Sequence, residues 1–381
     1  MKVSISVGGR FHGFNMASYF QDAGILHELV TGYPKMTVKK FGIPTQKIKS
    51  IYVNEIIGRL TSKLGIGYPF NFIACELYDY ITARTIKKDA DVYFLWSGFA
   101  LKTIRSIRKH NKKAKIVLVR GSAHISDQEQ LLRKIDGTTK QQIDLRMVKK
   151  EINEYDESDY ITVPSKFAFD SFISQGITKD KLFLNILGVD LSEFPFKKKE
   201  PQEKLNIGYA GIISQQKNVK GIITAIENLN KIEDKFVLHI AGDFDTDYAD
   251  LNLFKAYPFI NYVGRLPQDK LYGFYNKIDV FVLNSVQDGF GMVILQAMSC
   301  GCAIIATTNT GGPDVIKDYQ NGIIIPIMDD ESLMEALSWF EKHKTLIPSM
   351  ALMNREITEK GFTWEDFGQR NLNFITKITA H

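Results

Sequence analysis

Short apolar runs alternate with amphipathic stretches along the first half of the chain. The runs have the length of buried strands, and stretches such as Phe70–Lys88 carry apolar residues at helical spacing. Strands that alternate with helices in this way form a parallel sheet covered by helices on both faces. The runs lie at Lys2–Val7, Ile25–Val30, Asp91–Leu95, Lys115–Val119, Asp159–Val163 and Lys181–Asn185.

A polar segment, residues 189–204, interrupts this alternation. It is rich in charge and holds two prolines, which is typical of a linker between domains. A second alternation follows, so the pattern predicts two α/β domains, 1–188 and 205–362. We expect residues 363–381 to form an amphipathic helix that crosses back to the first domain. The second set of strands lies at Leu205–Ala210, Phe236–Ala241, Phe259–Val263, Asp279–Leu283, Ala303–Ala306 and Gly322–Ile325.

The stretch Asn284–Pro313 joins strand, loop, helix and strand. Its loop carries one acid, Asp288, and two glycines, Gly289 and Gly291, directly before the helix. Free backbone N–H groups and the positive end of the helix dipole favour an anion there, above all a phosphate. A glycine pair follows the next strand, and loops at the ends of adjacent parallel strands enclose a crevice. The residues therefore predict a phosphate-bearing ligand against the second domain.

The composition is that of a globular protein, with 44% hydrophobic and 24% charged residues over 381 positions. Three cysteines, Cys75, Cys300 and Cys302, form no usual metal or disulfide pattern, which fits a reducing compartment. The N-terminal MKVSISVGG has the character of a strand and not of a signal peptide. No apolar run approaches the ~20 residues that span a bilayer. We therefore expect a cytoplasmic protein.

The net charge of +5 is concentrated in the first third of the chain. Residues 31–70 hold seven Lys or Arg and one acid, Glu55, with aromatic residues among them. Such a segment is commonly a solvated face, but it equally suits an anionic surface or substrate, such as a membrane leaflet or a lipid-linked phosphate. The segment is otherwise irregular, with one helix predicted near Asn54–Lys63, and its length suits a functional insert.

Residues 288–305, DGFGMVILQAMSCGCAII, resemble the donor-binding signature of retaining nucleotide-sugar glycosyltransferases of family four, which have the GT-B fold. Their pattern is a Glu, seven residues and a second Glu, then Ala-Met and Gly, followed by a strand and a Gly-Gly turn. The resemblance implies two Rossmann-like domains that face each other across a cleft. It covers nearly the whole chain, including Gly8-Gly9, Glu154–Ser165, Leu187–Phe194, Tyr209–Gly221, His239–Asp243 and Tyr262–Leu271.

The resemblance implies a role for most residues of this signature. Asp288 stands at the first Glu and would bind hydroxyls of the donor sugar, whereas Gln296 stands at the second and would face the ribose. Asp is one methylene shorter than Glu and Gln is uncharged, so both departures bear on which donor is used. Backbone N–H groups at the helix start would hold the sugar and the distal phosphate. The residues of this turn are Gly289, Phe290, Gly291 and Met292.

Lys217 lies six residues after Gly211, where the family has a Lys that binds the donor diphosphate. Without the resemblance, a Lys at a helix start is an ordinary surface residue. The neighbouring Arg of the family is absent because Ile212 takes its place, so the leaving diphosphate lacks one cation. Gly9 and Leu266 complete the donor contacts that the resemblance implies.

Two histidines and two arginines complete the candidate site. His124 matches the family's active-site His near the donor sugar, so the resemblance implies a catalytic role for it beside Asp288. We expect His12 and Arg120 to contact the acceptor, although a His at a helix start is equally often a plain surface residue. Arg120 or Arg265 would be able to supply the missing cation.

The acidic turn Asp243–Asp247 has the D-x-D spacing of some divalent-cation sites. It follows a strand where the family has a donor loop and no metal, so we expect neither metal nor cofactor. The resemblance implies front-face transfer from a UDP- or GDP-sugar to a hydroxyl of a glycan or lipid-linked acceptor. Bacterial surface polysaccharide or glycolipid assembly is the expected setting, and nucleic acid is not expected as a partner.

Other functions remain open from the sequence. A GT-B epimerase or phosphorylase would bind phosphate in the same cleft. A non-catalytic sugar-nucleotide-binding protein also fits, because both Glu positions are altered. A dinucleotide-dependent oxidoreductase is disfavoured, since neither glycine loop has the Rossmann spacing.

Overall fold

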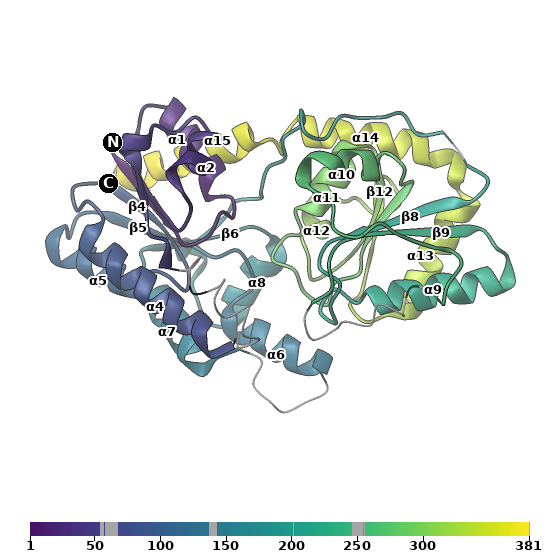
Figure 1. Cartoon of the computed structure of the whole chain (residues 1–381), viewed down its shortest axis with the longest axis horizontal. Helices are drawn as coiled ribbons and strands as arrows, with labels where there is room; N and C mark the ends of the chain where they lie inside the picture. The colour runs from purple at the N-terminus through teal and green to yellow at the C-terminus, as the bar shows by residue number, and fades with distance from the viewer. Residues whose placement is uncertain are drawn as a thin grey trace.

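The computed structural model describes residues 1–53, 57, 68–136, 143–200, 202–245, 254 and 256–380. These residues form two lobes, each built on one parallel sheet with helices around it (Figure 1). The helix predicted near Asn54–Lys63 lies almost wholly outside the described residues. The two alternating patterns of the sequence thus correspond to two separate sheets.

The first sheet has seven strands in the order β3-β2-β1-β4-β5-β6-β7. Its central strands are buried along their whole length because helices cover both faces. The short edge strand Ile48–Ser50 was not predicted, since only one of its three residues is apolar. The strands are β1 (Val3–Val7), β2 (Leu26–Thr31), β3 (Ile48–Ser50), β4 (Val92–Trp96), β5 (Lys115–Val119), β6 (Tyr160–Val163) and β7 (Leu182–Leu184).

The helices of the first lobe follow the expected alternation. The described residues of the basic 31–70 segment contain the short helix α2, a 3-10 turn at Thr45–Lys47 and the edge strand β3, and α4 begins at Tyr68. No helix among the described residues is both long and apolar enough to cross a membrane. The helices are α1 (Gly13–Asp22), α2 (Lys35–Lys39), α4 (Tyr68–Thr85), α5 (Leu101–His110), α6 (Ile125–Asp136), α7 (Leu145–Glu157) and α8 (Lys166–Ser174).

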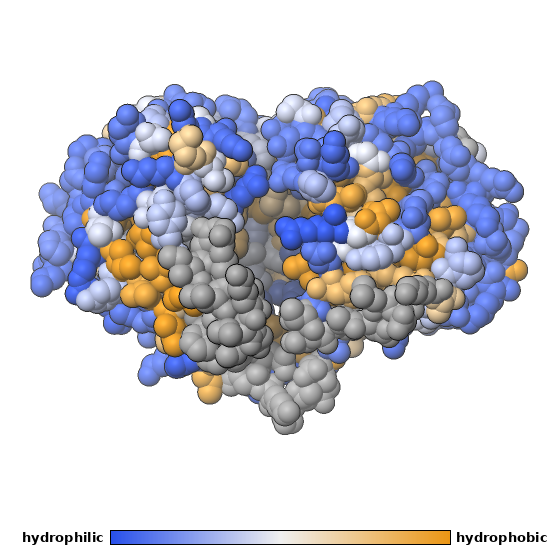
Figure 2. All heavy atoms as spheres, viewed as in Figure 1, coloured by the Kyte–Doolittle hydropathy of each residue, from blue (hydrophilic) through white to orange (hydrophobic). Residues whose placement is uncertain are grey.

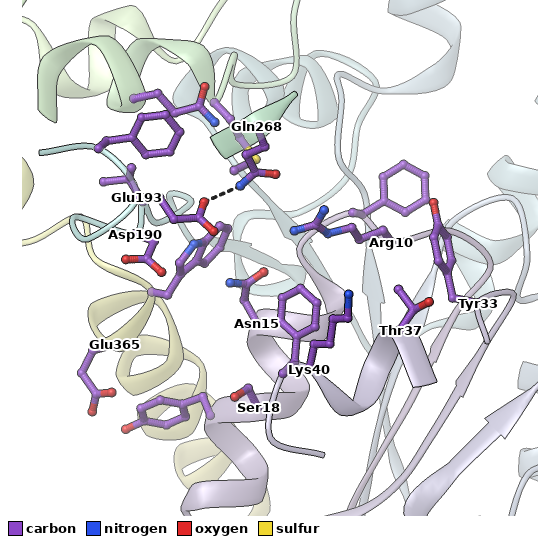
Figure 3. A pocket seen from close by; sticks show the side chains of 18 of the residues that line it. Arg10, Asn15, Ser18, Tyr33, Thr37, Lys40, Asp190, Glu193, Gln268 and Glu365 are labelled. Carbon is purple, nitrogen blue, oxygen red and sulfur yellow. Dashed lines mark hydrogen bonds between the residues drawn. The ribbon is translucent and has the colours of Figure 1, made fainter. Parts of the chain in front are cut away.

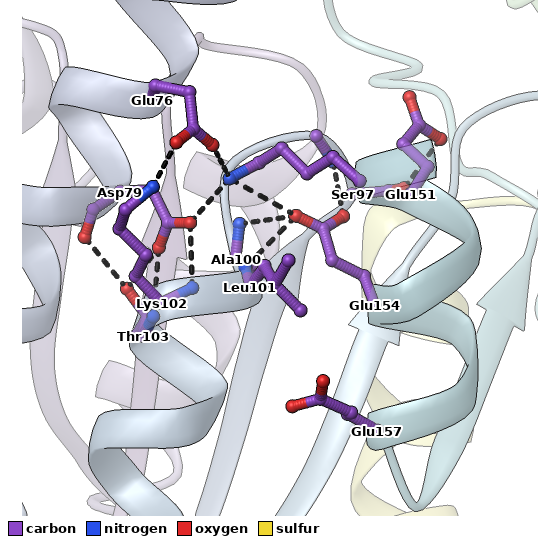
Figure 4. Close-up of polar contacts among 12 residues, drawn as sticks. Glu76, Asp79, Ser97, Ala100, Leu101, Lys102, Thr103, Glu151, Glu154 and Glu157 are labelled. Atoms are coloured by element: carbon purple, nitrogen blue, oxygen red, sulfur yellow. Dashed lines mark hydrogen bonds and ion pairs between the residues drawn. The ribbon is translucent and has the colours of Figure 1, made fainter. Parts of the chain in front are cut away.

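Buried carboxylates hold the start of α5 (Figure 4). Glu154 accepts the backbone N–H groups of Gly98 at 2.6 Å and Ala100 at 2.9 Å. Asp79 accepts the backbone N–H groups of Lys102 and Thr103, and its carboxylate also lies 2.6 Å from the Lys150 ammonium. Burial raises the pKa of Glu154 to about 8. The carboxylates satisfy N–H groups that a helix start leaves without partners, so this network is structural.

The second sheet has six strands in the order β10-β9-β8-β11-β12-β13, all at predicted positions. Strand order reverses between β8 and β11, as it does between β1 and β4 in the first sheet, and ligands of such sheets bind at these switch points. The strands are β8 (Leu205–Ala210), β9 (Phe236–Ala241), β10 (Ile260–Tyr262), β11 (Val280–Leu283), β12 (Ala303–Thr307) and β13 (Gly322–Ile325). The helices are α9 (Val219–Ile232), α10 (Gln268–Tyr275), α11 (Val293–Ser299), α12 (Gly312–Val315), α13 (Asp330–Lys342) and α14 (Ile347–Glu359).

The chain crosses between the lobes twice, and the two crossings lie side by side. The Val189 N–H donates to the Phe362 carbonyl at 2.8 Å. After the second crossing, α15 (Trp364–Thr379) packs on α1 of the first lobe (Figure 1). A capping box formed by Thr363 and Asp366 starts this helix. The expected return of the C-terminal helix is confirmed.

Candidate active site

Two loops meet at the switch point of the second sheet. One follows β8 and the other follows β11, and both leave the carboxyl edge of the sheet. The Val286 N–H donates to the Gln216 carbonyl at 2.9 Å, and the Gln216 amide donates to the Gln287 carbonyl at 2.8 Å. The two loops therefore form one hydrogen-bonded unit.

The Lys217 side chain reaches across this junction to Asp288. Its ammonium lies 2.5 Å from the carboxylate, and the side chains are only 20% and 25% exposed. The Asp288 N–H is bonded to the Asn309 carbonyl at 2.9 Å, which fixes the loop from behind. The structure thus brings together the cation and the carboxylate that the sequence assigned to the donor diphosphate and the donor sugar.

The turn before α11 depends on close packing. Gly291 has a φ of +80°, and a Cβ there would lie 2.5 Å from the Leu283 side chain, so only glycine fits. The Phe290 ring is buried against Gly311, and its carbonyl accepts the Gly311 N–H at 2.7 Å. Within the described residues, no acceptor is recorded for the N–H groups of residues 290–292. The Phe290 side chain is therefore core, and at this position the turn offers only its backbone to a ligand.

Gln296 is half-buried on α11, and its Oε1 accepts a hydrogen bond from the Tyr275 hydroxyl at 3.0 Å. Together with Met292 it lines a large cavity between the lobes. Tyr275 itself is fully buried, so this bond orients the amide from the core.

A smaller pocket of about 480 Å³ lies beside the loops that follow β8, β9 and β10. Leu266 lines it together with Gly211 and Arg265. Arg265 faces the first carboxylate of the acidic turn, Asp243, at 3.5 Å, and both side chains are exposed. Among the described residues, no group of three His, Cys, Asp or Glu is placed to hold a metal ion.

The first lobe closes directly onto the donor loop. A Cβ on Gly289 would lie 1.8 Å from the Gly121 carbonyl oxygen, so the two backbones touch. The Ser165 hydroxyl, which also caps α8, donates to the Gly289 carbonyl at 2.5 Å. Nearby, the Lys166 N–H donates to Asp314 at 3.0 Å, and burial raises the pKa of this carboxyl to about 6. These contacts join the lobes at the candidate site.

His124 lies in the same region of the first lobe but is only 5% exposed. Its ring centroid is 4.9 Å from that of Tyr155 and 5.0 Å from that of Phe172. Its Nδ1 accepts the Ser126 N–H at 3.2 Å, which places the ring proton on Nε2. Burial lowers the pKa of His124, so the imidazole is neutral at physiological pH.

The structure does not support an acceptor contact at His12. Its ring is buried between those of Trp96 and Phe367, with centroids 5.1 Å and 5.5 Å away. Burial lowers its pKa to about 4. Phe367 belongs to the returning helix α15, so this environment was invisible in the local sequence. His12 is a core residue, which corrects its assignment to the acceptor.

Arg120 also takes a structural place. Its guanidinium lies 2.9 Å from the Glu151 carboxylate and donates to Gln128 at 2.6 Å and to the Ala123 carbonyl at 3.1 Å. Each of its nitrogens is thus engaged within the first lobe. The expectation that Arg120 contacts the acceptor or replaces the missing diphosphate cation is therefore corrected as well.

The large cavity between the lobes has a volume of about 960 Å³ (Figure 3). The loop after β1 contributes Arg10 to it, and Gly9 of that loop packs against the Phe11 ring. Arg10 was not predicted as a site residue, although its position directly after the Gly8-Gly9 pair could have indicated it. Other lining residues are Asn15, Tyr33, Lys40, Phe41, Asp190, Glu193, Gln268 and Trp364.

Two Rossmann-like domains with a cavity between them, and switch points whose loops lie at the carboxyl edge of each sheet, are the architecture of the GT-B class. The comparison with known proteins gives a match to one family. The profile described as Glycosyl transferases group 1 matches residues 190–360, which include the whole second sheet. The second domain is thus similar to this family of glycosyltransferases, as the signature at 288–305 indicated.

Relatives and solved structures agree with this placement. The chain is 24% identical over 208 residues to WcaL of Escherichia coli K12, named as a colanic acid biosynthesis glycosyltransferase; this covers 52% of the chain and 50% of WcaL. The chain spans between 50% and 66% of the length of the first curated relatives it matches.

Sucrose-phosphate synthase from Thermosynechococcus elongatus superimposes with a TM-score of 0.73 at 15% identity, covering 100% of this chain and 99% of the other. Anabaena HepE in complex with UDP gives 0.70 at 13% identity, covering 99% and 100%. At such identities the likeness shows the fold, and the expected GT-B fold is confirmed.

Proposed function

We propose that this protein is a retaining glycosyltransferase that takes a sugar from a nucleotide sugar, with UDP- and GDP-sugars as the candidate donors. The observation that most supports this proposal is the Lys217–Asp288 ion pair at the junction of the loops after β8 and β11. Similarity to the glycosyltransferase family and the UDP complex of the structurally similar HepE support the same reading, and favour a UDP-sugar.

In this proposal the donor replaces the internal ion pair. The diphosphate binds the Lys217 ammonium, and sugar hydroxyls donate hydrogen bonds to the Asp288 carboxylate. Each side chain thus exchanges its partner in the ion pair for a charged or polar group of the donor. The smaller pocket at Gly211 and Leu266 receives the nucleoside. Because Lys217 and the N–H groups before α11 hold charge on the leaving diphosphate, they stabilise the transition state more than the ground state.

Transfer then proceeds on one face of the sugar. The bond from the anomeric carbon to the phosphate oxygen breaks, and the acceptor oxygen bonds to the same carbon from the same side. The acceptor proton passes to the leaving phosphate, so no side-chain nucleophile is required. We propose that neither a metal nor a cofactor takes part; full activity after EDTA treatment is the expected result, and Mg²⁺-dependent recovery would contradict it.

The acceptor is proposed to be a hydroxyl of a glycan or of a lipid-linked glycan in surface polysaccharide or glycolipid assembly. The name of the relative WcaL supports the polysaccharide setting. The basic residues of segment 31–70 support peripheral contact with an anionic membrane. Flotation with anionic but not with neutral vesicles is the expected outcome.

The site assignment is tested with Lys217→Ala and Asp288→Ala. We expect each substitution to lower turnover of the donor at least tenfold, about 1.4 kcal/mol of transition-state stabilisation, because each removes a charged contact to the donor. A screen of UDP- and GDP-sugars by thermal shift first identifies the donor. Release of the free nucleotide is then followed for the wild type and both variants.

Lys220→Ala and Asp269→Ala are matched controls, since both residues are exposed in the same domain. Near-normal rates in both site variants would refute the assignment. Donor binding without transfer to any acceptor extract would point instead to a non-catalytic binding protein. Conversion of the donor alone would point to an epimerase, and phosphate-dependent cleavage to a phosphorylase.

A further inference from the structure

Two cations extend into the large cavity from the first lobe without an acidic partner. Arg10 comes from the loop after β1, and Lys40 follows α2 (Figure 3). Among the described residues, neither side chain has a recorded ion pair or hydrogen bond, and the Arg10 guanidinium instead lies 5.2 Å from the Phe41 ring centroid. Other arginines of the first lobe form ion pairs. Arg120 pairs with Glu151, and Arg105 of α5 pairs with Glu157. These two positive charges are therefore available to a ligand.

The backbone holds this loop in a conformation that its residues do not favour. Phe11 has a φ of +35°, in the left-handed region, which costs a non-glycine residue about 1–2 kcal/mol. Its ring is nevertheless 59% exposed. A strained backbone that turns an aromatic ring outward, next to an unpaired Arg, is typical of a ligand site and not of a packed loop.

Aromatic rings flank the two cations. Tyr33 and Phe41 line the cavity, and both pack edge-on against the buried Phe14, with ring centroids 5.6 Å and 5.4 Å away. These rings are thus held in place before any ligand arrives. They give the first-lobe wall an apolar surface next to its positive charge.

The other charged residues of the cavity are acidic: Asp22 and Glu365 lie on the first-lobe side, and the opposite wall is acidic as well. Asp190 and Glu193 line it, and Gln268 of α10 donates to Glu193 at 2.5 Å (Figure 3). Carboxylates repel an anion and accept hydrogen bonds from hydroxyls. A ligand that spans the cavity is therefore oriented, with its anionic end toward Arg10 and Lys40 and its hydroxyl groups toward the acidic wall.

We propose that Arg10 and Lys40 bind the phosphate of a phosphate-ester acceptor, whose apolar part lies on Tyr33 and Phe41. This inference rests on the proposed glycosyl transfer and names the class of its acceptor. The donor diphosphate is a poorer match for these cations, because Gly211 of the Lys217 loop lines the separate, smaller pocket. From the second lobe, Arg10 shares its cavity with Gln268, Met292 and Gln296.

The test compares ligands that differ by one phosphate group. Geranyl phosphate is the probe, geraniol is its uncharged match, inorganic phosphate is the bare anion, and UDP reports on the donor site. Binding is measured by isothermal titration for the wild type, Arg10→Met, Lys40→Met and Lys39→Met. Lys39 is an exposed lysine that does not line the cavity, so its substitution makes the same change in net charge.

We expect the wild type to bind geranyl phosphate more tightly than geraniol or inorganic phosphate. Arg10→Met and Lys40→Met should each weaken that binding about tenfold and leave the UDP affinity unchanged, whereas Lys39→Met should change neither. Equal binding of geranyl phosphate and geraniol would overturn the proposal, as would equal losses in Lys39→Met and Lys40→Met.

A lower UDP affinity in Arg10→Met would also overturn it, in favour of a donor contact. Failure of the underlying function is distinguishable, because it shows as wild-type protein that binds neither UDP nor any nucleotide sugar. Melting temperatures confirm that the exposed substitutions leave the fold intact.

Discussion

His12 is held between the rings of Trp96 and Phe367, where protonation would place an unpaired charge in the core. The folded state therefore prefers the neutral imidazole, and the pKa falls from 6.5 to about 4. Because the unfolded chain binds the proton more readily, the stability that His12 contributes is present above about pH 6.5 and is lost as the pH falls toward 4.

Replacing His12 by Phe should remove this pH dependence while keeping an aromatic ring in the site. Between about pH 7.5 and pH 4, we expect the free energy of unfolding of the wild type to fall by about 3 kcal/mol more than that of the variant. Urea unfolding at the two pH values measures the difference. Parallel losses in both proteins would show that His12 is not the titrating group.

At the same scale, the Lys217–Asp288 pair shows why a charged residue near a cleft differs from one at the surface. Both side chains are mostly covered, and the bond joins two loops that are 71 positions apart in the chain. A surface pair would be worth at most about 1 kcal/mol. In the proposed function, the Lys217 ammonium binds the donor diphosphate and the Asp288 carboxylate binds sugar hydroxyls. The pair would then hold both side chains at the site before a donor arrives.

Helix α15 is the element that ties the end of the chain to its beginning. It packs on α1, and Phe374 stacks on Phe183 with ring centroids 4.1 Å apart. The contact with α1 is tight at Gly368, where a Cβ would lie 2.1 Å from the Tyr19 ring. The Tyr19 ring cannot move aside far enough to admit a Cβ at that distance. Glycine is therefore required at position 368 for α15 to approach α1.

Gly368→Ala should therefore destabilise the protein even though Ala favours a helix over Gly. We expect the free energy of unfolding to fall by about 1–3 kcal/mol, the range of overpacked cores. Gly361→Ala is the matched control, since nothing lies within 4 Å of a Cβ at that position. Chemical denaturation measures both, and an equally small change in the two variants would refute the packing argument.

Across the whole molecule, the two lobes meet at the donor loop itself. Ser165 starts α8 in the first lobe and donates to the Gly289 carbonyl in the second, and Asp314 accepts from the N–H of Lys166. Closure of the lobes and the shape of the loop are therefore coupled by the same residues. A domain motion that opens the cleft has to break these bonds.

Ser165→Ala should loosen the closed state. We expect a larger radius of gyration in solution scattering and a several-fold lower turnover, because the bond to the Gly289 carbonyl is lost. Ser165→Thr keeps a hydroxyl and should restore turnover. Asp329→Ala controls for the loss of a helix cap, since Asp329 caps α13 within one domain. An unchanged radius of gyration in Ser165→Ala would contradict this coupling.

The sequence by itself determined the order of strands and helices, the two-domain division of the pattern and the loop around Asp288. The resemblance to a family also predicts Lys217 as a donor contact, and the structure pairs this residue with Asp288. These features are readable because the period of apolar residues is local, and because a glycine-rich turn has to follow its own strand. Strand β3 was not predicted, since its sequence IKS contains a single apolar residue.

Only the tertiary structure decided which polar side chains face the cleft. Arg120 lies in a loop that resembles an active-site loop of the family. Its guanidinium nevertheless forms an ion pair with Glu151, which lies 31 positions further along the chain. His12 is covered by a helix from the other end of the chain, whereas Arg10, two positions before it, faces the cavity. Burial and pairing are set by distant segments, and no local pattern records them. Function in this cleft therefore rests on long-range packing that places each charge.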